Sequence, residues 1–147
     1  MKHILFITLF LAFLFPSVQL SAQDKEIDFS TNTWDWILAE AKVKKKLIFI
    51  DAYTSWCGPC KWAAKYVFTN KDVAIYYNEN FINVSMDMEK GEGIAFAKRF
   101  RVNAYPTFLI INDRLEIVSR MEGVDQTKRF FTQFIEFGKN AQAQSKK

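Results

Sequence analysis

Short apolar runs and longer stretches of helical periodicity follow one another along this chain. The run 46–52 is apolar without alternation, which is typical of a central strand covered by helices on both faces. The segment 81–88 alternates apolar and polar residues and predicts a second strand. The runs 107–111 and 115–121 flank the polar turn 112–114, so we expect them to form an antiparallel pair.

Helical spacing predicts the elements between these strands. The first helix has apolar residues at i, i+3, i+4 and i+7, and its candidate N-caps are Ser30, Asn32 and Thr33. A second helix is expected over 57–68, a third after the cap Asn70, and a short fourth around Phe96. Asp125 is expected to cap a last helix with a wide phenylalanine stripe. The order predicts an α/β fold, in which helices cover both faces of a mixed four- or five-stranded sheet.

The first residues differ in character from the rest of the chain. Lys2 and His3 precede the apolar run 4–15, and Pro16 and the small-residue stretch 17–22 follow it, which is a secretory signal pattern. The apolar run is shorter than the roughly 20 residues that span a bilayer, so we expect no stable membrane insertion. We therefore predict export, with cleavage near Ala22, to the periplasm or to the extracellular space.

The remaining chain divides into three parts. Residues 23–32 are polar and predict a loosely ordered N-terminal arm, within which Ile27 and Phe29 are expected to form a short edge strand. Residues 33–139 form the expected domain. The polar tail 140–147 is expected to be disordered.

The net charge and the histidine content limit the partners and the kinds of catalysis that we expect. The 147 residues carry a formal net charge of +4, and the loss of Lys2 with the signal lowers it to +3, which is mild for a domain of this size. The lysines at 42 and 44–46 cluster at a predicted helix end, where cations complement the dipole, so we expect no nucleic-acid partner. His3 is the only histidine, so the mature chain lacks an imidazole for catalysis or metal binding. We expect a monomer without a cofactor or a metal.

The two cysteines, Cys57 and Cys60, stand at the junction between the predicted strand 46–52 and the following helix. Three positions apart on a first helical turn, their sulfurs lie on one face and close enough to form a disulfide. The free N–H groups and the dipole of that turn favour a thiolate at Cys57. Pro59 suits a first-turn position, and Gly58 leaves space for an incoming disulfide. The carboxyl end of a parallel strand is also where such sheets bind ligands.

Other uses of the cysteine pair remain open. A structural disulfide is possible, although a loop this short constrains the unfolded chain little. A closed zinc or iron–sulfur site needs ligands that one mature chain lacks, which leaves only sites shared in a dimer. Haem attachment fails because Lys61 follows the second cysteine.

The sequence around this pair resembles the thioredoxin superfamily. Residues 56–61 read Trp-Cys-Gly-Pro-Cys-Lys, as in the family's active-site signature, and Asp51 stands six residues before Cys57, as the family's buried carboxylate does. Tyr105-Pro106-Thr107 is similar to the family's cis-proline loop. The resemblance covers roughly 33–137 and implies the thioredoxin fold. The signal pattern and the segments 54–56, 69–80 and 104–107 look most like exported thiol:disulfide interchange proteins, such as the periplasmic C-terminal domain of the transmembrane thiol-reducing protein.

The resemblance implies roles for individual residues. Cys57 would attack a partner's disulfide, Cys60 would resolve the mixed disulfide, and Asp51 would accept the proton of Cys60. The backbone of Tyr105 beside a cis Pro106 would hold the substrate chain as an added strand. Four further residues would form an apolar rim that contacts the substrate, and they are Trp56, Gly58, Pro59 and Gly123. Two alternatives stay open, namely an Asp51 without a proton role and a trans Pro106.

Two departures from the family pattern change the expected site. Thioredoxins often carry a lysine on the strand that faces the buried carboxylate, whereas this chain offers Asn83 or Ser85. Burial would then raise the pKa of Asp51 without an ammonium to oppose it. Tyr53 stands where the family has an indole beside the active site, so docking surfaces are expected to differ.

The Gly-Pro pair between the cysteines resembles the reducing thioredoxins, so we predict a protein-disulfide reductase. In an oxidising compartment it would act on protein disulfides and need a membrane-embedded thiol carrier as its electron donor. The alternatives are a disulfide oxidase or isomerase, a non-enzymatic binding protein of thioredoxin fold, and a metallochaperone that binds Cu(I) or Zn(II) through the dithiol.

Overall fold

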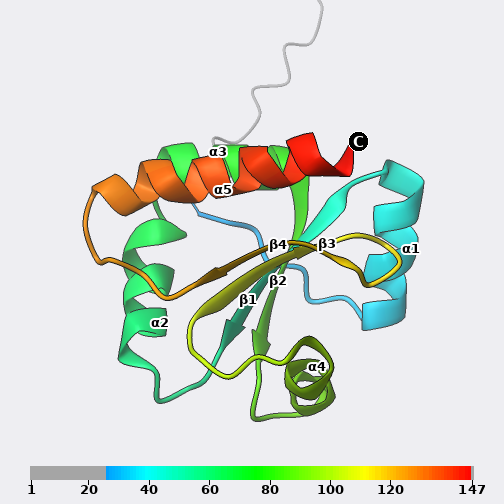
Figure 1. The fold of residues 1–147 in the computed structure, drawn as a ribbon, viewed down its shortest axis with the longest axis horizontal. Helices are drawn as coiled ribbons and strands as arrows, with labels where there is room; N and C mark the ends of the chain where they lie inside the picture. The colour runs from blue at the N-terminus through cyan, green and yellow to red at the C-terminus, as the bar shows by residue number, and fades with distance from the viewer. Residues whose placement is uncertain (1–25, 147) are drawn as a thin grey trace, which may run out of the picture.

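A computed structural model describes residues 26–146 of the chain (Figure 1). The signal-peptide prediction therefore lies outside the described residues. The elements, in order, are α1 (Trp34–Lys44), β1 (Leu47–Tyr53), α2 (Gly58–Trp62), the π-helix η1 (Ala63–Val67), α3 (Lys71–Asn80), β2 (Phe81–Asp87), α4 (Glu92–Phe100), β3 (Thr107–Ile111), β4 (Ile117–Glu122) and α5 (Arg129–Ser145).

The strands form one four-stranded sheet in the order β2-β1-β3-β4. β1 pairs in parallel with β2 and antiparallel with β3, and β4 pairs antiparallel with β3. One face is covered by α2, η1, α3 and α5, and the other by α1 and α4 (Figure 1). Five consecutive residues of β1 are buried, which confirms the central, doubly covered strand predicted from its unbroken apolar run.

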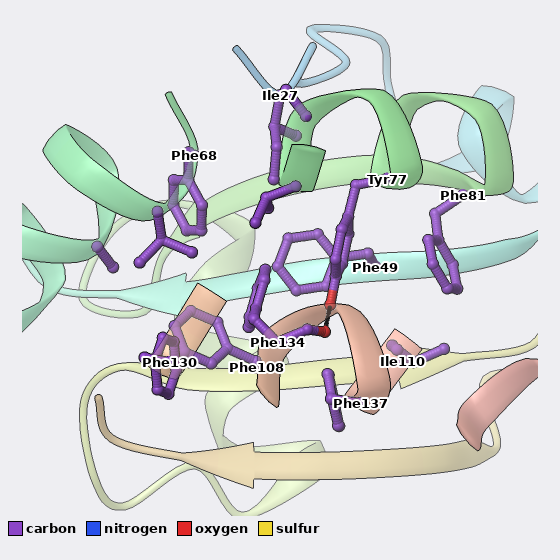
Figure 2. Packing of buried hydrophobic residues seen from close by; sticks show 14 of the residues in the cluster. Ile27, Phe49, Phe68, Tyr77, Phe81, Phe108, Ile110, Phe130, Phe134 and Phe137 are labelled. Carbon is purple, nitrogen blue, oxygen red and sulfur yellow. Dashed lines mark hydrogen bonds between the residues drawn. The ribbon is translucent and has the colours of Figure 1, made fainter. Parts of the chain in front are cut away.

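The core on the α3/α5 face consists largely of aromatic rings (Figure 2). Phe134 of α5 is fully buried and stacks on Tyr77 of α3, with the two ring centroids 4.6 Å apart. Phe49 of β1 packs edge-on against both rings. The Tyr77 hydroxyl donates a hydrogen bond to the Phe134 carbonyl at 2.8 Å, so its one polar group is paired inside the core. These contacts fix both helices on the strand that leads to the cysteines.

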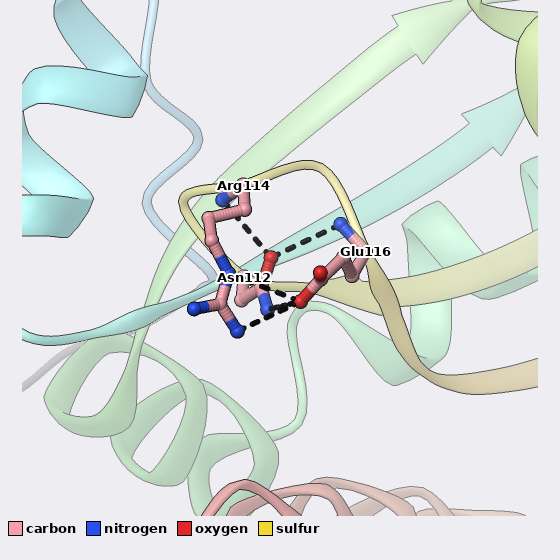
Figure 3. Close-up of polar contacts among 3 residues, drawn as sticks. All are labelled: Asn112, Arg114 and Glu116. Carbon is pink, nitrogen blue, oxygen red and sulfur yellow. Dashed lines mark hydrogen bonds and ion pairs between the residues drawn. The ribbon is translucent and has the colours of Figure 1, made fainter.

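The β3–β4 connection is held by a small polar cluster (Figure 3). The Asn112 side-chain oxygen accepts hydrogen bonds from the backbone N–H groups of Arg114 and Glu116, at 2.9 and 3.0 Å. The Glu116 carboxylate in turn receives the Arg114 guanidinium at 2.9 Å. Leu115 has a positive φ of 63°, so the chain is still turning there. As a result β4 begins at Ile117, two residues later than predicted.

For the helix N-caps of α3 and α5, the sequence predicted one correctly and the other wrongly. Asn70 caps α3 as predicted, since its side chain accepts hydrogen bonds from the backbone N–H groups of Asp72 and Val73. The expected cap Asp125 is wrong, because α5 begins at Arg129 and Lys128 occupies the N-cap position. Asp125 instead accepts hydrogen bonds from the backbone and hydroxyl of Thr127, a local turn that precedes the helix.

Both ends of the domain extend beyond the predicted limits. Ile27 of the expected loose arm is 4% exposed, and its N–H donates to the Phe68 carbonyl at 2.8 Å, while the Ser30 N–H donates to the Asn83 carbonyl, so these two residues hold the arm on the domain. Phe29 forms only an isolated bridge with Asn83 and not the edge strand that we expected. The prediction of a disordered tail from 140 is also wrong, because α5 runs through Ser145 and buries Ala141 completely.

Candidate active site

The cysteine pair lies just beyond the carboxyl end of β1. The Cys57 N–H donates to the Thr54 carbonyl at 3.2 Å, which closes the loop after the strand. Cys57 has an extended backbone and is the N-cap of α2, which begins one residue later than predicted, at Gly58. Pro59 falls within the first turn, where its missing N–H costs no helical hydrogen bond. The loop thus presents Cys57 at the positive end of the helix.

Cys57 and Cys60 form a disulfide, with their Cα atoms 5.3 Å apart. The backbone N–H of Cys60 also points at the Cys57 sulfur, with 3.1 Å between the nitrogen and the sulfur. In the reduced protein the same N–H can donate to a thiolate at Cys57, which favours the ionised form of that sulfur. The two residues are 3% and 6% exposed, so the bond is accessible only along a narrow part of the surface.

Asp51 lies within β1 and is 5% exposed. It pairs in register with Ser85 of β2, whose hydroxyl donates a hydrogen bond to Asp51 Oδ2 at 2.9 Å. Burial raises the pKa of Asp51 to about 7, and the Ser85 hydrogen bond only partly opposes that rise. Of the two candidates for the position facing the carboxylate, Ser85 is therefore the one that contacts it. The other oxygen, Oδ1, is buried without a hydrogen-bond partner in the described part of the chain.

Several predicted rim residues meet around the loop before β3. The Tyr105–Pro106 peptide bond is cis, as the resemblance implied. The Gly123 N–H donates to the Pro106 carbonyl at 2.8 Å, and the φ of +75° at Gly123 is one that glycine adopts readily. The exposed Trp56 ring stands edge-on to the Tyr105 ring, with the centroids 5.9 Å apart. Trp56, Tyr105, Pro106 and Gly123 thus line one edge of the domain next to the dithiol.

Gly58 and Pro59 complete the candidate rim at the start of α2. A side chain added at Gly58 would meet no atom within 4 Å, so this position faces open space. The helix continues from α2 into η1, and the expected single helix 57–68 therefore ends in π-helical geometry. π-helical turns are rare and often occur at functional sites.

Glu89 is a site residue that the sequence analysis did not identify. Its carboxylate accepts a hydrogen bond from the Trp56 indole N–H at 2.9 Å, which fixes the exposed ring beside Tyr105. Glu89 lies two residues beyond the end of β2 at Asp87, and the Met88 N–H between them donates to the Tyr53 carbonyl, so the ends of β1 and β2 lie together. Parallel pairing of the first two strands would have placed a residue after β2 at the same edge as the cysteines.

The described residues also allow two statements about other kinds of site. Between residues 26 and 146, no three His, Cys, Asp or Glu side chains come together as a metal site requires. None of the helices in that part of the chain has the length and apolar character needed to cross a bilayer.

A mixed sheet covered by helices on both faces, with a disulfide at the start of a helix and a cis proline beside it, defines the thioredoxin-fold thiol–disulfide oxidoreductases. A family model described as Thioredoxin matches residues 26–136, so the chain belongs to the thioredoxin family. Thioredoxin-1 of Drosophila melanogaster is 32% identical over 83 residues, which cover 56% of this chain and 72% of that protein. Thioredoxin H4 of Arabidopsis thaliana is 33% identical over 97 residues, which cover 66% of this chain and 76% of that protein.

Solved structures agree with the family assignment. The solution structure of a candidate disulphide-isomerase from Bacteroides thetaiotaomicron is 42% identical, with a TM-score of 0.66 over 80% of this chain and 96% of that chain. A thioredoxin from Thermus thermophilus is 20% identical and supports the fold alone, with a TM-score of 0.64 over 80% of this chain and 87% of that chain. The chain is thus a thioredoxin-fold disulfide oxidoreductase whose redox pair is Cys57 and Cys60.

Proposed function

We propose that this oxidoreductase is an exported protein-disulfide reductase. The observation that carries the exchange chemistry is the contact between the Cys60 N–H and the Cys57 sulfur at the start of α2. That contact stabilises a Cys57 thiolate and makes the first cysteine the nucleophile. The N-terminal signal pattern supports export, and the Gly58-Pro59 pair between the cysteines supports a reducing potential.

The reaction proceeds in two exchange steps. The Cys57 thiolate attacks one sulfur of the partner's disulfide, forms a mixed disulfide and releases the other sulfur as a thiolate. Cys60 then attacks the Cys57 sulfur, which releases the second partner thiolate and leaves Cys57 and Cys60 joined. Two electrons pass from the dithiol to the partner. Asp51 accepts the proton that Cys60 loses, a role for which a pKa of about 7 is suited at neutral pH.

Continued reduction requires a source of electrons outside the cytosol. We assign that role to a membrane-embedded thiol carrier, because the oxidised pair must be reduced again after each cycle. The edge formed by Trp56, Tyr105, Pro106 and Gly123 is the surface that such a carrier and the substrates share. There the Tyr105 backbone before the cis proline holds the partner segment as an added strand.

Two measurements test the proposal. The equilibrium potential against glutathione should lie near the reducing thioredoxins, at roughly −270 mV, and a value near about −120 mV would reverse the direction of electron flow. The Cys60→Ser variant, expressed in its host with the full chain, should accumulate mixed disulfides through Cys57. The Cys57→Ser variant is the matched control, and mixed disulfides in that variant alone would exchange the roles of the two cysteines.

An isomerase is the second candidate, and one comparison favours it. The Bacteroides protein, which is 42% identical, is described as a candidate disulphide-isomerase. In isomerisation Cys57 attacks a substrate disulfide, and a substrate thiolate must displace Cys57 from the mixed disulfide before Cys60 forms the Cys57–Cys60 disulfide. A scrambled disulfide protein would therefore regain its native pairing with the Cys60→Ser variant as well as with the wild type. A reductase would leave that substrate reduced and would need Cys60.

A further inference from the structure

The helix that begins at the dithiol and the start of α5 together carry a partly exposed aromatic patch. We define the aromatic patch as Trp62, Tyr66 and Phe131. Tyr66 is 44% exposed, and the other two side chains are half-buried. The Trp62 ring lies 5.4 Å from the Tyr66 ring and stacks on Phe131 of α5 at 6.3 Å. Figure 1 shows α2 and the first turns of α5 on the same side of the molecule.

Two lysines border this patch. Lys61 and Lys65 are exposed, and no carboxylate in residues 26–146 lies within 4 Å of either ammonium. The Lys61 N–H donates to the Cys57 carbonyl at 3.2 Å, so Lys61 lies one turn from the proposed nucleophile. Lys65 follows about one turn later, and its ammonium lies over the Tyr66 ring, 5.0 Å from the centroid. The two lysines and the adjoining rings thus form one strip that starts at the dithiol and consists of Lys61, Trp62, Lys65 and Tyr66.

The acidic content of this helix differs from that of the other helices. Each of α1, α3, α4 and α5 contains at least one Asp or Glu, and Lys44 of α1 and Lys139 of α5 pair with a carboxylate three or four residues earlier in the chain. The ten residues of α2 and η1 contain no Asp or Glu at all, so the strip has no internal acidic partner on its own helix. A positive strip of this kind attracts an acidic segment and repels a basic one.

We propose that this strip binds the polypeptide segment next to the partner's disulfide, and that it selects segments with acidic and aromatic or long apolar side chains. This inference rests on the proposed function, because it extends the substrate surface beyond Trp56 and the cis-proline edge. Lys65 is eight residues from Cys57, or about 12 Å along a helix at 1.5 Å per residue. An extended chain covers that distance in about four residues. The acidic side chains of the partner are therefore expected two to four positions from its cysteine.

The main test compares two matched disulfide peptides. They share length, disulfide loop and one flanking phenylalanine, and they differ only in Glu or Lys at positions two and four from the cysteine. The wild-type protein should reduce the acidic peptide about fivefold faster in kcat/KM, and the preference should decline as salt is raised. The variant K61E/K65E should lose or reverse the preference.

The control variant replaces two lysines by glutamate on another part of the surface, so its net charge equals that of K61E/K65E. K42E/K98E alters exposed lysines on α1 and α4, which cover the opposite face of the sheet, and it should retain the wild-type preference. Equal rates for both peptides in the wild type would overturn the inference and leave the reductase proposal intact. A preference that both double variants lose equally would also overturn it, since net charge alone would then explain the effect.

A binding measurement separates the inference from the proposed function. The variant C57S/C60S cannot exchange disulfides, so we would titrate it with the acidic peptide and follow amide and indole shifts by NMR. Shifts centred on Lys61, Trp62 and Tyr66 would support the strip even if the wild type reduced neither peptide. Shifts elsewhere, or none, would overturn it. A last experiment measures sedimentation of the protein with anionic vesicles. If the wild type binds the vesicles, K61E/K65E does not, and neither protein prefers the acidic peptide, the strip binds a lipid surface and the inference is overturned.

Discussion

Replacing Asp51 by asparagine should change the pH dependence of stability more than any other single substitution in the sheet. Asp51 is 5% exposed, and one of its carboxyl oxygens has no hydrogen-bond partner among the described residues. Its ionised form is therefore poorly tolerated by the fold. Asparagine has nearly the same shape and can still accept the Ser85 hydrogen bond, but it does not ionise.

The size of the effect follows from the pKa. Burial raises the pKa of Asp51 from its usual 3.8 to about 7 in the folded protein. A rise of that size corresponds to about 4 kcal/mol between the two protonation states. Because the folded pKa is the higher one, stability from this group is complete below pH 3.8 and falls as the pH rises to about 7. Between pH 5 and pH 8 the wild type should lose about 2 to 3 kcal/mol through Asp51 alone.

The assay is urea unfolding of the oxidised wild type and the Asp51→Asn variant at several pH values from 5 to 8. The disulfide stays closed in both proteins, so neither cysteine titrates. Other titrating groups cancel in the difference between the two free energies of unfolding. That difference should move in favour of the variant by about 2 to 3 kcal/mol across the range. A difference that stays constant with pH would refute the raised pKa.

The Ser85→Ala variant provides a control for the same reasoning. The Ser85 hydroxyl donates to Asp51 and thereby lowers the pKa of the carboxyl group, against the larger effect of burial. Without that hydrogen bond the pKa should rise further, and the loss of stability should continue to a higher pH. An unchanged pH profile would show that the hydrogen bond does not influence the carboxylate.

The remaining predictions concern packing, and each is tested by measuring the stability of the variant in thermal or urea unfolding. Tyr77→Phe removes the buried hydrogen bond to the Phe134 carbonyl and should cost about 1 kcal/mol, and an unchanged stability would contradict that contact. Phe134→Ala opens the centre of the aromatic core and should cost about 3 to 5 kcal/mol. Gly93→Ala would drive a methyl group into the Asp87 backbone and should cost about 1 to 3 kcal/mol, whereas Gly58→Ala, which faces open space, should change stability little.

Much of the fold could be predicted because its signals are local. The unbroken apolar runs of β1 and β3 mark strands that are buried on both faces, and Asn70 marks a helix start through its own side-chain hydrogen bonds. The end of α5 was missed for the opposite reason. Its last turns are polar in sequence, and they remain helical because Ala141 packs into the aromatic core. Tertiary packing, more than helix propensity, stabilises helices in proteins.

By itself the sequence determined the cysteine pair: two cysteines stand three positions apart at a strand-to-helix junction, a spacing at which one helical turn places both sulfurs together. Asp51, six residues before Cys57, was assigned to the site only through the resemblance to the thioredoxins. Only the tertiary structure decided that Ser85 and not Asn83 contacts Asp51, that Glu89 holds Trp56, and that α5 completes the aromatic patch. These contacts join segments far apart in the chain. Which residues meet depends on the register of the paired strands and on how the helices pack.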